Sequence, residues 1–209
     1  MQHGSNINII FNKLIQAIGN PTTELHYSTN FELLIAVMLS ARTTDVSVNK
    51  ATKELFKVAN TPEQIIQLGL THLKQYIKSL GFYNTKATNI IKTCSILIDK
   101  FNGQIPQTSE ELESLPGVGR KTANVVLNVA FNQSTIAVDT HVKRVAKRIG
   151  LAKGKTPLEI EAELKQNIPK KFHHLISNLL ILHGRYTCKA KKPLCSICVI
   201  NDLCEKNGV

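Results

Sequence analysis

Four of the five cysteines lie close together near the C-terminal end of the sequence. Cys188, Cys195, Cys198 and Cys204 have the spacing C-x6-C-x2-C-x5-C. Four thiolates this close suit either a tetrahedral zinc site or a four-iron, four-sulfur cluster, and the spacing alone leaves both metals open. In a reducing compartment such a cluster is more often a metal site than a disulfide set, and its density makes free structural cysteines the weaker alternative. The fifth, Cys94, lies in an apolar stretch and is expected in the core.

Three lysines occupy the loop between the first two of these cysteines: Lys189, Lys191 and Lys192. Metal coordination would hold this loop and present three ammonium groups outward, which suits contact with a phosphate backbone. The alternative is a solvated charged loop without a partner.

The segment Leu115–Gly119 reads Leu-Pro-Gly-Val-Gly and lies between two expected helices. Its proline ends the first helix, and Gly117 and Gly119 permit φ > 0 and leave backbone N–H groups uncovered. The second helix is expected to begin near Arg120, with its positive N-terminal end able to bind one phosphate. Lys121 follows immediately, beside that phosphate. A helix-hairpin-helix of this kind grips the DNA backbone without reading sequence, and the alternative is an ordinary turn between helices.

Cap residues and hydrophobic periodicity predict helices along nearly the whole chain. A threonine followed three residues later by Glu or Gln is expected to begin a helix at four places: Thr29, Thr61, Thr108 and Thr156. Asp45 and Asp139 are expected as further caps. Between Arg120 and Phe131, apolar residues recur at i, i+3, i+4 and i+7, which predicts one buried helix face. We expect nine or ten helices and no strand hairpin, with residues 135–138 forming an extended linker.

The chain of 209 residues has a formal net charge of +11. Residues 139–209 hold 14 basic and 6 acidic side chains, so most of the excess lies there. A basic surplus in one part indicates a polyanionic partner, with plain solubility as the alternative. No apolar run approaches the roughly 20 residues of a membrane span, and the N-terminus lacks a secretory pattern. We therefore expect a cytoplasmic protein with no membrane partner.

Together these motifs resemble the endonuclease III family of helix-hairpin-helix DNA glycosylases. The resemblance rests on Leu115–Leu127, Ile136–His141, Leu180–Cys188, Glu32–Thr52 and the cysteine spacing. It implies an all-α fold of two helical domains flanking a DNA cleft. Residues 22–133 would form a six-helix domain with the hairpin, and residues 1–21 with 134–209 an iron–sulfur cluster domain. It also favours a 4Fe-4S cluster over zinc on the four cysteines.

The resemblance further implies a bifunctional DNA glycosylase and abasic-site lyase of base excision repair, with Lys121 as nucleophile and Asp139 as essential carboxylate. The expected partner is double-stranded DNA containing oxidised pyrimidines or abasic sites, bound by a monomer in a bacterial cytosol. An amine attacking C1′ would expel the base and form a Schiff base, and β-elimination would then break the strand. Arg120, the helix N-terminus and a dry pocket would favour the neutral amine that this attack requires. Asp139 would stabilise positive charge on the sugar or move a proton, unless it only caps its helix.

A lesion inside the stack must be flipped out before it can react. In the family, side chains from two loops fill the space that the base leaves, and the matching positions are Arg42 and Phe82. Family members often have Gln and Leu there. An arginine can hydrogen-bond the orphaned base and a phenylalanine can wedge by stacking. Ser40, Asp45 and His141 match further polar positions near the family's site, and the alternative for each is a cap or a core contact.

Two rival functions remain at this point. A monofunctional glycosylase of the same fold, such as the adenine-mismatch type, would share the cluster and the aspartate but lack a lysine at position 121. A non-catalytic DNA-binding module stapled by metal would keep the glycines and cysteines without needing Lys121 paired with Asp139.

Overall fold

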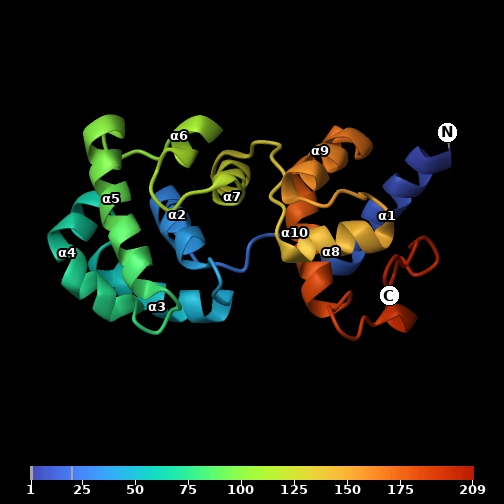
Figure 1. Cartoon of the computed structure of the whole chain (residues 1–209), viewed down its shortest axis with the longest axis horizontal. Helices are drawn as coiled ribbons and strands as arrows, with labels where there is room; N and C mark the ends of the chain where they lie inside the picture. The colour runs from blue at the N-terminus through green and yellow to red at the C-terminus, as the bar shows by residue number, and fades with distance from the viewer. Residues whose placement is uncertain (1, 20) are drawn as a thin grey trace. The chain divides into compact units, whose positions relative to one another are not determined.

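The computed structural model describes residues 2–19 and 21–209, and side chains from residue 6 onward except residue 20. Within these ranges the chain forms ten α-helices, two short 3-10 helices and no strand (Figure 1), which confirms the all-α class. The chain divides into two compact units, one of residues 24–131 and one of residues 1–23 and 132–209. No helix in the described part is long and apolar enough to cross a membrane.

The unit of residues 24–131 is built around one helix that is buried from its second residue onward. Its helices are α2 (Asn30–Leu39), α3 (Asp45–Val58), α4 (Pro62–Ile77), α5 (Tyr83–Phe101), α6 (Ser109–Glu113) and α7 (Arg120–Phe131). Every residue from 31 to 39 is buried, as expected for a helix that is apolar on all sides. Helix α2 contacts α7, α3 and α5, and the predicted apolar face of α7 contributes Ala123, Val126 and Leu127 to the same core. Cys94 is also buried there, and burial raises the pKa of its thiol to about 12.

Helix starts in this unit follow the cap chemistry expected from the sequence, with one exception. The side chains of Thr29, Thr61 and Thr108 each accept a hydrogen bond from the backbone N–H three residues later. The prediction that Asp45 caps the third helix is wrong, because Thr44 is the cap and its Oγ1 accepts from the Ser47 N–H at 3.3 Å. Asp45 is the first helical residue, where a carboxylate still faces the positive end of the helix.

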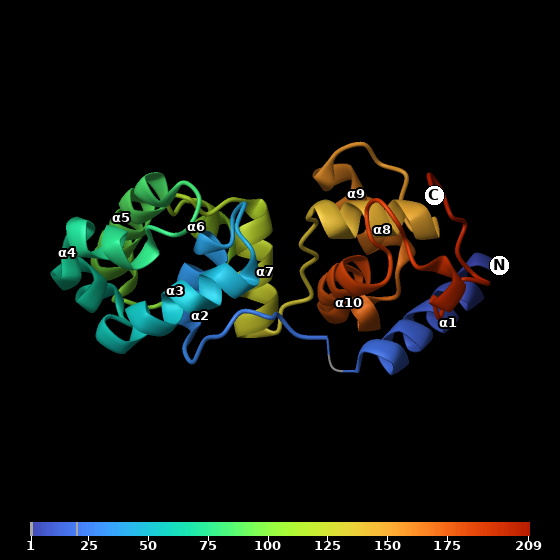
Figure 2. The same ribbon diagram turned by 90° about the horizontal axis from the view of Figure 1, so that it is seen from below.

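The second unit packs its helices around α10 (Figure 2). Its elements are α1 (Gln2–Ile18), α8 (Thr140–Ile149), α9 (Pro157–Asn167), η1 (Lys170–Phe172), α10 (His173–Tyr186) and η2 (Cys195–Ile197). Helix α10 contacts α8 and α1. Gly184 makes the close approach to α8 possible, since a Cβ there would lie 3.0 Å from Val145 Cγ2 and 3.2 Å from His141 Cβ.

Local signals in the second unit also agree with the sequence. Thr156 and Glu159 form the reciprocal capping box at the start of α9. Residues 135–138 belong to no helix or strand, as expected for a linker, and residues 136–138 are buried. The Ala137 N–H donates to Ser177 Oγ on α10 at 2.8 Å. This contact fixes the linker directly before Asp139.

Candidate functional site

The turn between α6 and α7 has the expected left-handed backbone at Gly117 but not at Gly119, whose φ is not positive. Gly117 has φ 81°, and a Cβ there would lie 2.8 Å from Asn89 Nδ2 on α5, so both the conformation and the close approach require glycine. The Thr93 hydroxyl donates to the Pro116 carbonyl at 3.0 Å and anchors the turn to α5. Helix α7 begins at Arg120 as expected, so the turn presents the helix N-terminus next to Gly119.

Lys121 lies in the first turn of α7 and is exposed, as are Gly117, Gly119 and Arg120. The expectation that a dry pocket surrounds the Lys121 amine stays a prediction. The side chain is accessible at the end of a helix whose backbone N–H groups can receive a phosphate.

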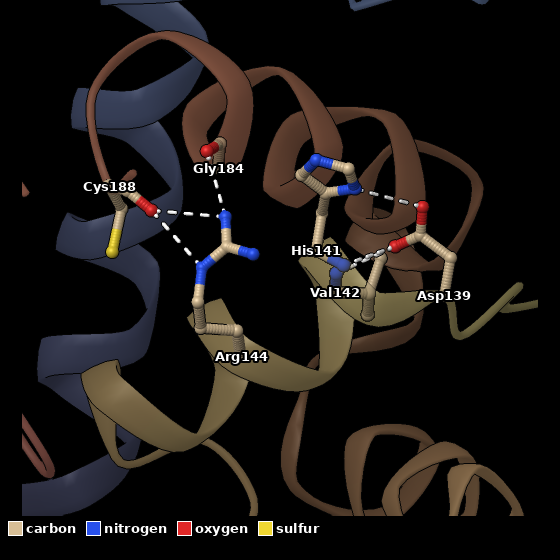
Figure 3. Close-up of polar contacts among 6 residues, drawn as sticks. All are labelled: Asp139, His141, Val142, Arg144, Gly184 and Cys188. Atoms are coloured by element: carbon tan, nitrogen blue, oxygen red, sulfur yellow. Dashed lines mark hydrogen bonds and ion pairs between the residues drawn. The ribbon is translucent and has the colours of Figure 1, made fainter. Parts of the chain in front are cut away.

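Asp139 is the N-cap of α8 and forms hydrogen bonds through both carboxylate oxygens (Figure 3). Oδ1 accepts from the N–H groups of His141 and Val142, both at 2.8 Å. Oδ2 lies 3.2 Å from Nδ1 of the His141 ring. The cap role expected from the sequence is therefore present. The two cap hydrogen bonds fix Oδ1, and Oδ2 is directed toward His141, which is only partly exposed.

Arg42 and Phe82 lie on different loops of the first unit but contact each other. The Arg42 guanidinium carbon is 5.4 Å from the centre of the Phe82 ring. Both residues are exposed and both have left-handed backbone, with φ 54° and φ 59°. A cavity of about 260 Å³ adjoins them and reaches Gly117 of the hairpin. The two positions named from the sequence are thus brought together beside the turn that precedes Lys121.

The two supporting polar residues near Arg42 have local roles. Ser40 is the C-cap of α2, and its hydroxyl donates to the Val37 carbonyl at 2.8 Å. Asp45 begins α3.

The four clustered cysteines line one cavity, together with Arg148 and His183. Burial raises the pKa of the Cys198 and Cys204 thiols, and the neighbouring cysteines raise both further. Thiolates gathered in this way need a cationic group among them, which an iron–sulfur cluster supplies. No three His, Cys, Asp or Glu side chains in the described residues are placed to hold a single metal ion. The donor set itself fits the cluster.

Two arginines of α8, which the sequence did not single out, bind the start of the segment that carries the four cysteines. Arg144 donates to the carbonyls of Gly184 and Cys188 at 2.8 and 3.1 Å (Figure 3). One turn later, Arg148 Nη1 lies 3.5 Å from Cys188 Sγ and donates to the Lys189 carbonyl at 2.7 Å. Their spacing of four residues on α8 was the available signal, and Arg148 is itself buried. The helix that carries Asp139 thus also positions the first cysteine.

The lysine loop is exposed along its length, with Lys189, Lys191 and Lys192 all facing solvent. Arg148 Nη2 donates to the Ala190 carbonyl at 2.9 Å within the same loop. The loop is therefore fixed at its base by α8 while its ammonium groups stay accessible.

Comparison with known proteins places these features in one family. A model described as "HhH-GPD superfamily base excision DNA repair protein" matches residues 35–170. A second, described as "Iron-sulfur binding domain of endonuclease III", matches residues 188–204, the segment of the four cysteines.

Curated relatives and solved structures agree over nearly the full length. Endonuclease III of Haemophilus influenzae is 57% identical over 196 residues, covering 94% of this chain and 93% of the relative. That of Escherichia coli K12 is 56% identical with the same coverage. A trapped covalent complex of endonuclease III with DNA matches with a TM-score of 0.91 and 46% identity, over 97% of this chain and 96% of that one. A thermostable thymine-DNA glycosylase at 21% identity, with a TM-score of 0.84 over 97% of this chain and 96% of that one, shares the fold.

Proposed function

The chain belongs to the endonuclease III family of helix-hairpin-helix base excision repair proteins, and on this premise we propose that Lys121 is its nucleophile and Asp139 its essential carboxylate. The protein is a bifunctional DNA glycosylase and abasic-site lyase, it acts on DNA, and it carries an iron–sulfur cluster. The proposal assigns the residues that perform these steps.

The observation that carries the proposal is the position of Lys121, exposed in the first turn of α7 directly after the glycine turn. A phosphate held by the backbone N–H groups of Gly117, Gly119 and Arg120 would bring the adjacent sugar within reach of the amine. The neutral amine attacks C1′, the bond from C1′ to the base breaks, and the departing base takes up a proton. Opening of the sugar ring gives the imine, loss of a C2′ proton then expels the 3′ phosphate, and water releases the lysine.

Asp139 supports the first of these steps through its two differently held oxygens. Oδ1 is committed to the N–H groups of His141 and Val142, so the carboxylate has little freedom to turn. Oδ2 then stabilises the positive charge that develops on the sugar, or carries the proton from the attacking amine. His141 touches Oδ2 and fixes its direction, and its ring is placed to contact DNA as well.

Damaged DNA is held by groups outside the reacting centre. Arg42 and Phe82 fill the space left by the flipped base, and Lys189, Lys191 and Lys192 contact backbone phosphates through their exposed ammonium groups. The substrates are oxidised pyrimidines and abasic sites in duplex DNA. The protein acts as a monomer in a bacterial cytosol; the relatives named above are bacterial proteins.

The cluster is of the 4Fe-4S type, held by Cys188, Cys195, Cys198 and Cys204, which line one cavity. It supplies folding energy to the C-terminal segment and takes no part in bond breaking, because the chemistry above uses only the amine and the carboxylate. Coordination also holds the lysine loop next to α8.

Borohydride trapping on duplex DNA with one oxidised pyrimidine tests the nucleophile. Lys121→Gln removes the amine but keeps the length and helix propensity, so the variant should retain its iron and bind damaged duplex. It should form no cross-link and lose most base excision. The control is Lys92→Gln, which replaces an exposed lysine of α5 and should cross-link normally. An undiminished cross-linked band with Lys121→Gln would move the nucleophile to another amine.

A further inference from the structure

Two bulky residues of the first unit have a backbone conformation that their side chains disfavour. Arg42 and Phe82 both have φ in the left-handed region, at 54° and 59°, where a Cβ crowds the neighbouring carbonyl oxygen. Such conformations persist only when surrounding contacts hold them, and they concentrate at functional sites. Specific contacts must therefore hold the Arg42 and Phe82 turns.

The stacking of Arg42 on Phe82 does not account for these backbone conformations. Phe82 is 62% exposed, and the guanidinium of Arg42 lies above its ring at the surface. A cation–π contact in water is a weak constraint. Phe82 is the N-cap of α5 but makes no side-chain cap hydrogen bond. The Thr43 N–H closes the Arg42 turn locally by donating to the Ser40 carbonyl at 3.1 Å, but this bond does not connect it with the turn at Phe82.

Lys86 contacts both turns. Its ammonium donates at 2.8 Å to the carbonyl of Leu39, the last residue of α2, and at 2.8 Å to the hydroxyl of Thr43, directly after Arg42. Its backbone N–H donates to the Phe82 carbonyl at 3.0 Å. The side chain thus joins both ends of the Arg42 turn to the first turn of α5, the helix whose N-cap is Phe82.

The burial of Lys86 makes these bonds strong determinants of geometry. Its residue is only 8% exposed, and burial lowers the pKa of its ammonium. A buried charge is costly unless its donors are satisfied, so its acceptors cannot drift away without penalty. Lys86 also lines the cavity of about 260 Å³ beside Arg42, Phe82 and Gly117.

We propose that Lys86 is a positioning residue that holds Arg42 and Phe82 as one preassembled pair, ready to enter the DNA together when the damaged base leaves. The inference rests on the proposed function, since it deepens the role given there to Arg42 and Phe82. In a preorganised pair, neither side chain has to be ordered at the moment of base flipping.

A double-mutant cycle on base excision tests whether the three residues act as a unit. Lys86→Met removes the ammonium and keeps the length, and displacing the pair should cut excision by about tenfold or more. Arg42→Ala by itself should lower base excision by about the same factor. Adding Arg42→Ala to Lys86→Met should then lower excision by less than about twofold, because residues that act as a unit are non-additive. A residue that only stabilised the fold would give additive losses.

The controls separate this inference from folding and from the proposed function. Lys92→Met alters an exposed lysine of α5 and should excise as the unaltered protein does. If Lys86→Met does not fold, Thr43→Val removes one of its acceptors and enters the same cycle. Unchanged excision by Lys86→Met, or additive losses with Arg42→Ala in either cycle, would overturn the inference. If the unaltered protein forms no cross-link and no nick in these assays, the proposed function fails instead.

Discussion

Asp139 combines a structural and a chemical role that a single substitution can separate. Its Oδ1 caps α8 through two backbone N–H groups, and its Oδ2 is assigned to the reaction. Asparagine is as good an N-cap as aspartate, but its amide carries no charge and accepts no proton. The residue therefore allows stability and catalysis to be measured independently.

We expect Asp139→Asn to change the free energy of unfolding by less than about 1 kcal/mol, the scale of the lost attraction between charge and helix dipole. Base excision should fall by about 100-fold or more in single-turnover assays, because a positioned acid or base contributes on that scale. Asp139→Ala is the matched control. Loss of the cap should lower its free energy of unfolding by about 1 kcal/mol, and base excision should be lost as well. Excision at normal rates by Asp139→Asn would leave Asp139 with the cap role alone.

At the scale of elements, α8 serves two sites. Its N-terminus holds Asp139, and Arg144 and Arg148 bind the backbone that carries Cys188 and the lysine loop. The segment after α10 contains only the short helix η2, and Ile200 is the only residue after Gly184 that is buried. Its order must therefore come largely from α8 and from metal coordination.

Removing one cysteine ligand of the cluster should release the segment after α10 from its contacts with α8. Cys198→Ser is expected to lose iron and acid-labile sulfide and to expose residues 189–204 to rapid amide hydrogen exchange. Cys94→Ala provides the control: it removes a buried thiol from the other unit and should retain full iron content despite some loss of stability. Retention of slow exchange in the Cys198→Ser segment would show that α8 holds it without the cluster.

At the scale of the whole molecule, the net charge of +11 favours DNA of any sequence. Non-specific binding of this kind is driven by counterion release, so the affinity for undamaged duplex should fall steeply with salt. The uneven distribution, with most of the excess in residues 139–209, predicts that particular lysines dominate the salt dependence.

Replacing Lys191 and Lys192 by alanine should flatten the slope of log K against log salt by about 0.9 for each lost phosphate contact. Lys170→Ala with Lys171→Ala is the matched control, since this pair is also adjacent, exposed and in the same unit. An equal change in both double variants would mean that general charge, and not the lysine loop, sets the slope. The measurement is a binding titration on undamaged duplex at several salt concentrations.

Features that depend on neighbours in the chain could be predicted from the sequence. The caps at Thr29, Thr61, Thr108 and Thr156, the start of α7 and the glycine turn all follow from hydrogen bonds and backbone sterics within a few residues. The iron–sulfur cofactor and the bifunctional activity expected from the resemblance are confirmed by the matching family. The cap of α3 was misplaced by one residue because Thr44 and Asp45 are both good cap residues, and only the backbone geometry selects between them.

Features that depend on distant main-chain oxygens were decided by the tertiary structure alone. Lys86 bonds a carbonyl 47 residues away, and Arg144 and Arg148 bond carbonyls about 40 residues away. Every residue carries a carbonyl, so no side-chain pattern marks the one that a buried cation will find. The sequence by itself determined the helices, the glycine turn, the clustered cysteines and the family. Which lysine holds the Arg42 and Phe82 turns, and which arginines hold the first cysteine, emerged only when folding brought those oxygens within reach.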